Sequence, residues 1–128
     1  MSEDSVTFGL RIHLGRAVPI VEVWGELDIL TAHEVPDRML PLLPEGCHSV
    51  VLDLRAVTFM DCGALSMLVR LQHRFRTRHG RQTLVLDNPF QLRVLRLTRL
   101  DEVLDIAADL DIALARHNGA TPIRDVSA

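Results

Sequence analysis

Asp61 and Cys62 are the two side chains that the sequence places best for chemistry. An apolar, β-branched run of strand length ends at Asp53, and a short link leads from there to Asp61. Beyond Asp61, apolar residues recur at helical spacing, at Ala64, Leu68, Leu71 and Phe75. A helix start of this kind has free N–H groups and a partial positive charge. It could present a nucleophile, a regulatory switch or a loop that binds a partner.

Cys62 is the strongest enzymatic hypothesis, because a helix N-terminus stabilises a thiolate. A sulfur carrier or a phosphatase would use such a thiol. A Cys-x5-Arg phosphatase loop, however, requires an arginine where this chain has Leu68. The sequence places no second cysteine and no histidine base nearby. We therefore interpret Cys62 as a small, partly buried residue, and keep a thiol enzyme or redox sensor as an alternative.

Three carboxylates lie near the ends of predicted elements. Asp28 and Asp53 lie at or just after the ends of predicted strands, and Asp61 lies at the start of a predicted helix. Ligands usually bind at the carboxyl edge of an open α/β sheet, and carboxylates could hold Mg²⁺ there. Their spacing specifies no coordination geometry. We predict no metal site and no cofactor, and expect each carboxylate to end a strand or cap a turn.

The composition excludes several classes of function. The chain has 128 residues, of which 48% are hydrophobic, so one domain with a real core is expected. All 14 basic residues are arginine, which removes Schiff-base chemistry and any lysine-dependent phosphate loop. The formal charge of −3 gives no global field for nucleic acid or for an anionic membrane. Neither a signal peptide nor an apolar run of roughly 20 residues is found, so we expect a cytoplasmic protein without membrane insertion.

A basic run over residues 70–81 could suggest nucleic-acid binding. Leu71 and Phe75 continue the apolar stripe of the helix through this run, so its cations belong to the outer face. We predict a solvated face, with a protein-docking patch as the second interpretation and nucleic acid as the third.

The elements that must position Asp61 alternate between strands and helices. The patterns predict an initial hairpin of residues 8–14 and 17–24, with Trp24 packed under a helix, and later strands at 49–53, 82–86 and 103–106. One helix is predicted from a capping box at Thr31 and Glu34 toward residue 43. A second begins at Asp61 or Cys62 and ends near Gly80, which suits the position after a helix C-terminus. Two further helices are predicted over residues 89–97 and 109–116. This order predicts a partly parallel sheet covered by helices. We expect residues 1–6 to be disordered, 7–117 to form the domain, and 118–128 to be a flexible tail.

Three blocks of the sequence carry a family resemblance. Residues 59–65, Phe-Met-Asp-Cys-Gly-Ala-Leu, resemble the Phe-x-Asp-Ser-Ser/Thr-Gly-Leu signature of STAS domains, the anti-sigma factor antagonists. Residues 25–28, Gly-Glu-Leu-Asp, resemble an element at the end of the family's second strand, and residues 94–104 resemble its penultimate helix and the following loop. The resemblance covers residues 7–117. It implies a STAS-like α/β fold, a mixed sheet of four to five strands with four helices mainly on one face.

The resemblance also implies a function without catalysis. Such a domain would sequester an anti-sigma factor, a kinase-like protein, and so regulate bacterial transcription without touching nucleic acid itself; a homodimer is a further option. The residues that it implies as partner-binding are Asp28, Thr58, Asp61, Cys62, Gly63, Ala64 and Ser66. An accessory subunit of a lipid-transport ATPase or scaffold complex is the alternative within the same family.

The chain departs from the family pattern at the phosphorylated position. Cys62 and Gly63 stand where the family has a pair of hydroxyl residues, and the second of these is the usual phosphoacceptor. Gly63 has no side chain to phosphorylate, so control at this position is predicted to be lost or moved. Ser66 and Thr58 are the candidate alternative acceptors.

Overall fold

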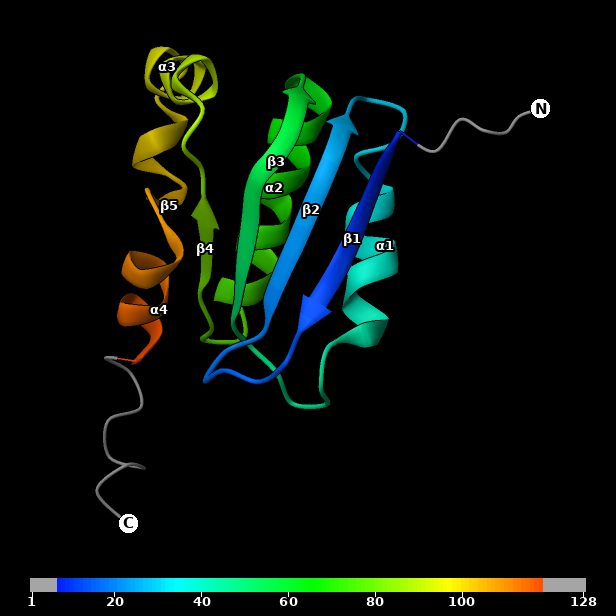
Figure 1. The fold of residues 1–128 in the computed structure, drawn as a ribbon, viewed down its shortest axis with the longest axis vertical. Coiled ribbons are helices and arrows are strands. Elements are labelled where there is room, and N and C mark those ends of the chain that lie inside the picture. Colours follow the sequence, from blue (N-terminus) through cyan, green and yellow to red (C-terminus); the bar gives the residue numbers. More distant parts are fainter. Residues whose placement is uncertain (1–6, 119–128) are drawn as a thin grey trace, which may run out of the picture.

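The computed structural model describes residues 7–118, which form one five-stranded sheet in the order β1-β2-β3-β4-β5 (Figure 1). The strands are β1 (Phe8–His13), β2 (Ile20–Leu27), β3 (Val50–Met60), β4 (Gln82–Val85) and β5 (Asp105–Ala107). β1 and β2 form the predicted antiparallel hairpin, and the other neighbouring strands pair in parallel. The predicted mixed sheet is therefore confirmed. The predictions for residues 1–6 and 119–128 lie outside the described residues.

Helices connect the strands as the sequence predicts. They are α1 (Glu34–Met39), α2 (Cys62–Arg76), α3 (Pro89–Leu97) and α4 (Leu110–Asn118), with short 3₁₀ turns at Leu40–Leu42 and Leu100–Glu102. The Asn88 side chain accepts hydrogen bonds from the N–H groups of Phe90 and Gln91, which caps α3 as its sequence indicates.

Two apolar clusters lie on opposite faces of the sheet. The larger one joins α1, α2 and α3 to one face, through buried residues such as Val23, Leu52 and Leu68. The smaller one places α4 on the other face, where Ala113 and Leu114 pack on Val18, Ile20, Val51, Val85 and Ala107. Three of the four helices thus share a face. The half of the other face formed by β1, β2 and the upper part of β3 carries no helix in the described chain (Figure 1).

The third strand is longer than the predicted 49–53, because residues 54–60 continue to pair with β2 through two irregularities in register. Asp53 therefore lies within β3 and not at its end. Arg55 donates two hydrogen bonds to it, from Nε at 2.9 Å and from Nη2 at 2.8 Å. Burial alone would raise the pKa of Asp53, but the hydrogen bonds and charge of Arg55 outweigh it and hold that pKa below its usual value. The carboxylate has a structural partner.

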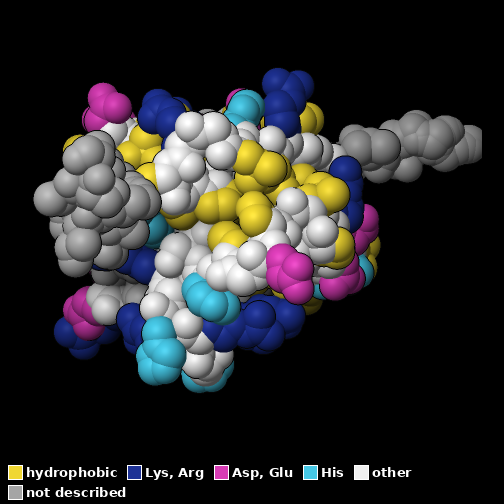
Figure 2. Space-filling view, turned by 90° about the horizontal axis from the view of Figure 1, so that it is seen from below, with side chains coloured by type: hydrophobic (Ala, Val, Ile, Leu, Met, Phe, Trp, Pro, Cys, Tyr) yellow, Lys and Arg dark blue, Asp and Glu magenta, His cyan; other side chains and the backbone are white. Residues whose placement is uncertain are grey.

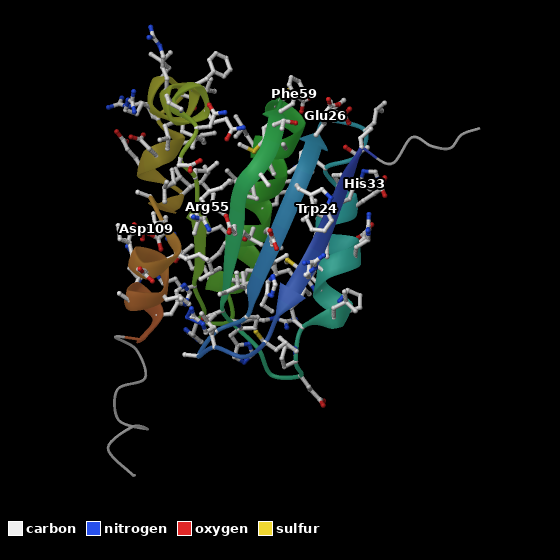
Figure 3. The ribbon with its side chains drawn as sticks, in the orientation of Figure 1. Trp24, Glu26, His33, Arg55, Phe59 and Asp109 are labelled. Atoms are coloured by element: carbon white, nitrogen blue, oxygen red, sulfur yellow. The ribbon has the colours of Figure 1, made fainter. Side chains whose placement is uncertain are left out.

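Trp24 does not pack under a helix. The prediction was wrong because β2 alternates Val21 and Val23 toward the helices, which turns Trp24 to the opposite, open face (Figure 3). Its ring lies over Gly9, and the guanidinium of Arg11 lies 5.8 Å from the ring centre.

Two predicted helix ends also differ. Thr31 does not cap α1, whose N-cap is His33 without a side-chain bond, because the Thr31 hydroxyl is bonded to Asp28. After α2, the left-handed position is His79 with φ of 63°, not Gly80. Gly80 is required for a different reason: a Cβ there would lie 1.4 Å from the carbonyl oxygen of His48.

Candidate functional site

Asp61 joins the start of α2 to the loop between β2 and α1. Its Oδ1 accepts hydrogen bonds from the N–H groups of Gly63 at 2.9 Å and Ala64 at 3.3 Å, so it is the N-cap of α2. Its Oδ2 accepts a further bond from the Ile29 N–H at 3.0 Å. One carboxylate therefore ties together two segments that are 32 residues apart in sequence.

Asp28 shapes the loop that Asp61 holds. Its Oδ1 accepts bonds from the Leu30 N–H, the Thr31 N–H and the Thr31 hydroxyl, at 2.9, 3.0 and 3.0 Å. The bond from the Thr31 hydroxyl is the main reason that the pKa of Asp28 is lowered. We name residues 28–31 the Asp28 loop. Its backbone is fixed by the carboxylate at its start, in the manner of an Asx turn.

The Asp28 loop packs directly against Gly63 and leaves no space for a side chain there. A Cβ at this position would lie 2.5 Å from the Cα of Ile29 and 3.0 Å from its Cβ. The position therefore lacks a hydroxyl and also lacks the room for any side chain while the loop stays in place. This contact was not predicted, since nothing local to residue 63 reveals which loop lies above it.

The other predicted partner-binding residues are spread over the same edge but differ in accessibility. Cys62 and Ser66 are exposed on α2, and Ser66 Oγ accepts a bond from Arg70 Nη1 at 2.5 Å. Thr58 is exposed on β3, and its hydroxyl donates to the Gly25 carbonyl at 3.3 Å. Ala64 is fully buried in the larger cluster, so its side chain offers a partner no surface.

The residues that the sequence reasoning missed are apolar and exposed. Ile29 and Leu30 in the Asp28 loop are 67% and 74% exposed, Phe59 near the end of β3 is 48% exposed, and Phe90 at the start of α3 is 73% exposed. We name these four residues the apolar edge. Phe59 lies beside Glu26 at the end of β2 and β3 (Figure 3). The signal available in the sequence was a pair of apolar residues directly after the strand-ending Asp28, where a solvated loop would be polar.

A small cavity of about 90 Å³ opens beside Phe59 and Phe90. Met60, Leu65 and Val94 contribute its apolar walls, and Gln91 lines it as well. Gln91 is 7% exposed; its Nε2 donates to the Val57 carbonyl at 3.2 Å, while its Oε1 has no hydrogen-bond partner. A buried acceptor left unpaired in this way costs free energy unless an incoming group donates to it.

The carboxylates do not converge on a metal. Asp53 lies within β3 with Arg55, whereas Asp28 and Asp61 are occupied by backbone N–H groups. Within residues 7–118 no group of three or more His, Cys, Asp or Glu side chains could hold a metal ion. No helix in that range is both long and apolar enough to cross a bilayer.

The basic run on α2 lies on the outside, as predicted. Arg70, His73, Arg74 and Arg76 are exposed, while Leu71 and Phe75 between them are buried. The cations at the end of α2 also suit the negative end of the helix dipole.

Comparison with known proteins finds a relative and solved structures that are similar to this chain. An anti-sigma-B factor antagonist of Staphylococcus epidermidis is 39% identical over 49 residues, which span 38% of this chain and 45% of that relative. The crystal structure of an anti-sigma factor antagonist from Mycobacterium paratuberculosis matches with a TM-score of 0.74 and 26% identity, covering 85% of this chain and 92% of that one. A putative anti-sigma factor antagonist from Thermotoga maritima matches with a TM-score of 0.67 and 26% identity, covering 87% and 94%.

A family model described as "Mlab, STAS domain" matches residues 10–111, which is most of the chain. The match spans the hairpin, the Asp28 loop, the Asp61 cap and the first residues of α4. The protein is therefore a member of the STAS domain family.

Proposed function

We propose that this STAS domain is an anti-sigma factor antagonist that binds a kinase-like anti-sigma factor through the apolar edge and the Asp61 cap. The observation that carries the proposal is the gathering of Ile29, Leu30, Phe59 and Phe90 at the edge of the sheet where Asp61 starts α2. The relatives named as anti-sigma factor antagonists supply the class of partner.

The apolar edge has the character of a protein interface. Its four large apolar side chains are exposed at one edge of the sheet, and exposed apolar patches mark protein-binding surfaces. The part of the edge that carries Ile29 and Leu30 is also held in place, because the carboxylates of Asp28 and Asp61 bond the backbone of the Asp28 loop. A preformed surface loses little conformational entropy on binding. Cys62, Ser66 and Thr58 lie near this surface as polar neighbours of the apolar contact.

Binding is proposed to be independent of phosphorylation at residue 63. A phosphate would add a charge of about −1.5 to −2 at the start of α2, and Gly63 cannot accept one. Because the Asp28 loop closes this position, its regulation is lost or has moved to another residue, for which Ser66 and Thr58 remain the candidates. The domain would then bind its partner constitutively.

The experiment is affinity capture of the tagged full chain from its native cells, followed by measurement of the binding affinity for the captured partner. The variant is Leu30→Ser and the matched control is Leu97→Ser, since Leu97 is equally exposed, at 73%, but lies at the far end of α3. We expect an anti-sigma factor with a kinase-like fold, bound at least about tenfold more weakly by Leu30→Ser and unchanged by Leu97→Ser.

Two outcomes would contradict the proposal. Equal affinity of the Leu30→Ser and Leu97→Ser variants would remove the apolar edge from the interface. Capture of transport-ATPase subunits in place of an anti-sigma factor would assign the domain to the scaffold role instead. Incubation of the captured pair with ATP, followed by mass spectrometry, tests the regulation: we expect no phosphate on the domain, and one on Ser66 or Thr58 would restore a switch.

A further inference from the structure

A cavity in the described chain lies at the end of the molecule opposite the apolar edge. It has a volume of about 440 Å³ and opens where the parallel strands begin, between the turn before β2, the loop before β3, the turn before β4 and the end of α4. Figure 2 views the molecule from this end and shows arginine and histidine side chains beside a strip of apolar ones. A cavity of this size is in the range that holds small ligands, and the proposed partner site does not use it.

Three arginines line this cavity, from three separate parts of the chain: Arg16, Arg81 and Arg116. One carboxylate, that of Asp105, pairs with two of them. Arg81 Nε lies 2.8 Å from its Oδ2, and Arg116 Nη1 lies 2.5 Å from its Oδ1. Arg16 has no ion-pair partner among residues 7–118. The three guanidinium groups therefore retain a formal surplus of two positive charges over Asp105.

The cationic wall is preorganised. Thr83 donates its hydroxyl proton to Asp105 Oδ2 at 2.7 Å, so it accepts from His117 Nε2 at 2.9 Å, which assigns the proton of this ring to Nε2. Arg116 Nη1 also donates to the Ile106 carbonyl at 2.9 Å. These bonds hold two arginines and a buried histidine in place before any ligand arrives, so little ordering remains to be done on binding.

Another part of the cavity lining is apolar and also fixed, and we name it the apolar wall. Leu14, Val18, Pro19 and Pro44 contribute to it, and Val18 is buried under α4. The Pro19 carbonyl accepts from the Val51 N–H at 3.0 Å, which anchors the start of β2 to β3. The cavity therefore has both cationic and apolar lining residues, a combination that suits an anion carrying a short apolar group.

We propose that this cavity binds a small phosphate monoester, with the phosphate at the three guanidinium groups and the ester group against the apolar wall. The surplus of two positive charges matches the charge of about −1.5 to −2 on a phosphate monoester at neutral pH. Guanidinium groups donate paired hydrogen bonds to phosphate oxygens, and the three arginines that line the cavity come from three separate parts of the chain. The inference is independent of the proposed function.

The test is an NMR titration of the full chain with butyl phosphate, with inorganic phosphate, pentanoate and butan-1-ol as separate arms. We expect butyl phosphate to give saturable shifts confined to residues 47–49, 80–81 and 116–117. Inorganic phosphate and pentanoate should bind more weakly, and butan-1-ol should not bind. Shifts of equal size for every anion, spread over surface arginines outside the cavity, would overturn the proposal, as would the absence of saturable binding.

Two variants separate the head group from the apolar wall. Arg16→Gln removes an exposed positive charge and should weaken butyl phosphate binding by about threefold to tenfold. Arg93→Gln removes the charge of an exposed arginine on α3 and should not change that binding. Ala17→Trp fills the mouth of the cavity without altering charge and should abolish binding, while circular dichroism confirms an intact fold. Unchanged affinity in Arg16→Gln or in Ala17→Trp would overturn the proposal.

Discussion

At the scale of single residues, Gly63 and Asp61 define the candidate partner site. Gly63 is where the Asp28 loop rests on α2, and Asp61 is the group that holds the loop there. The glycine that removes the phosphoacceptor hydroxyl is thus also the residue that lets the Asp28 loop pack against α2. A hydroxyl at residue 63 would be incompatible with the loop position that the structure shows.

Gly63→Ala tests this contact. In an open helix, replacing glycine by alanine stabilises by up to about 1 kcal/mol. Here the new Cβ would meet the Ile29 Cα at 2.5 Å, so we expect destabilisation of about 1–3 kcal/mol, measured by urea unfolding. Cys62→Ser, at the exposed neighbouring residue, is the control and should change stability by less than about 0.5 kcal/mol. A Gly63→Ala variant more stable than the wild type would show that the Asp28 loop moves away without cost, and would contradict the prediction.

Asp61→Ala removes one helix cap and the bond to the loop together. We expect a loss of about 1–2 kcal/mol in the free energy of unfolding. The diagnostic measurement is hydrogen exchange of the Ile29 amide, which should become faster because its acceptor is gone. Asp53→Ala offers a comparison at a carboxylate outside the loop, and it should leave that amide unchanged. Unaltered exchange at Ile29 in Asp61→Ala would contradict the proposed tie.

At the scale of elements, a buried histidine joins α4 to strand β4. His117 is 6% exposed and bonded to Thr83 of β4. Burial is the main reason that its pKa is lowered, the charge of Arg81 adds to the effect, and Asp105 opposes it. The folded protein therefore binds this proton less readily than the unfolded chain does.

The sign of the resulting pH effect follows from linkage. Above the ordinary histidine pKa of 6.5 both states are neutral, and the stability contributed by His117 is complete. As the pH falls below 6.5, the unfolded chain takes up the proton first, so the free energy of unfolding should decrease. Urea unfolding between about pH 7.5 and pH 5 measures it. His117→Gln should flatten this dependence, whereas His33→Gln, at the exposed N-cap position before α1, should leave it intact. An NMR titration midpoint for His117 at or above 6.5 would refute the prediction.

At the scale of the whole molecule, two apolar clusters share one sheet. Strands β2, β3 and β4 contribute residues to both, so neither cluster can open without disturbing the strands that support the other. We expect one cooperative unfolding transition. Far-ultraviolet circular dichroism, fluorescence of Trp24 on the open face, and NMR signals of Ala113 on α4 should give the same midpoint. An earlier loss of the Ala113 signals would show that α4 unfolds separately.

Local sequence patterns determined much of this protein. The alternation of residues 8–14, the helical spacing after Asp61, and the Asn88-Pro89 start of α3 depend on interactions within a few residues, so the hairpin and these helices could be predicted. The sequence alone also established that residue 63 has no hydroxyl. The length of β3 was underestimated, because residues 54–60 form a strand through pairing with β2 and their own pattern does not indicate one.

Only the tertiary structure decided how distant segments meet. The contact of Ile29 with Gly63, the open-face position of Trp24 and the gathering of Arg16, Arg81 and Arg116 around one cavity all join residues that are far apart in the chain. Propensity and periodicity describe neighbours along the chain, whereas these contacts depend on which elements stack and on which face each strand turns outward. Local sequence patterns therefore predicted most of the helices and strands, whereas the two candidate sites depend on how these elements pack.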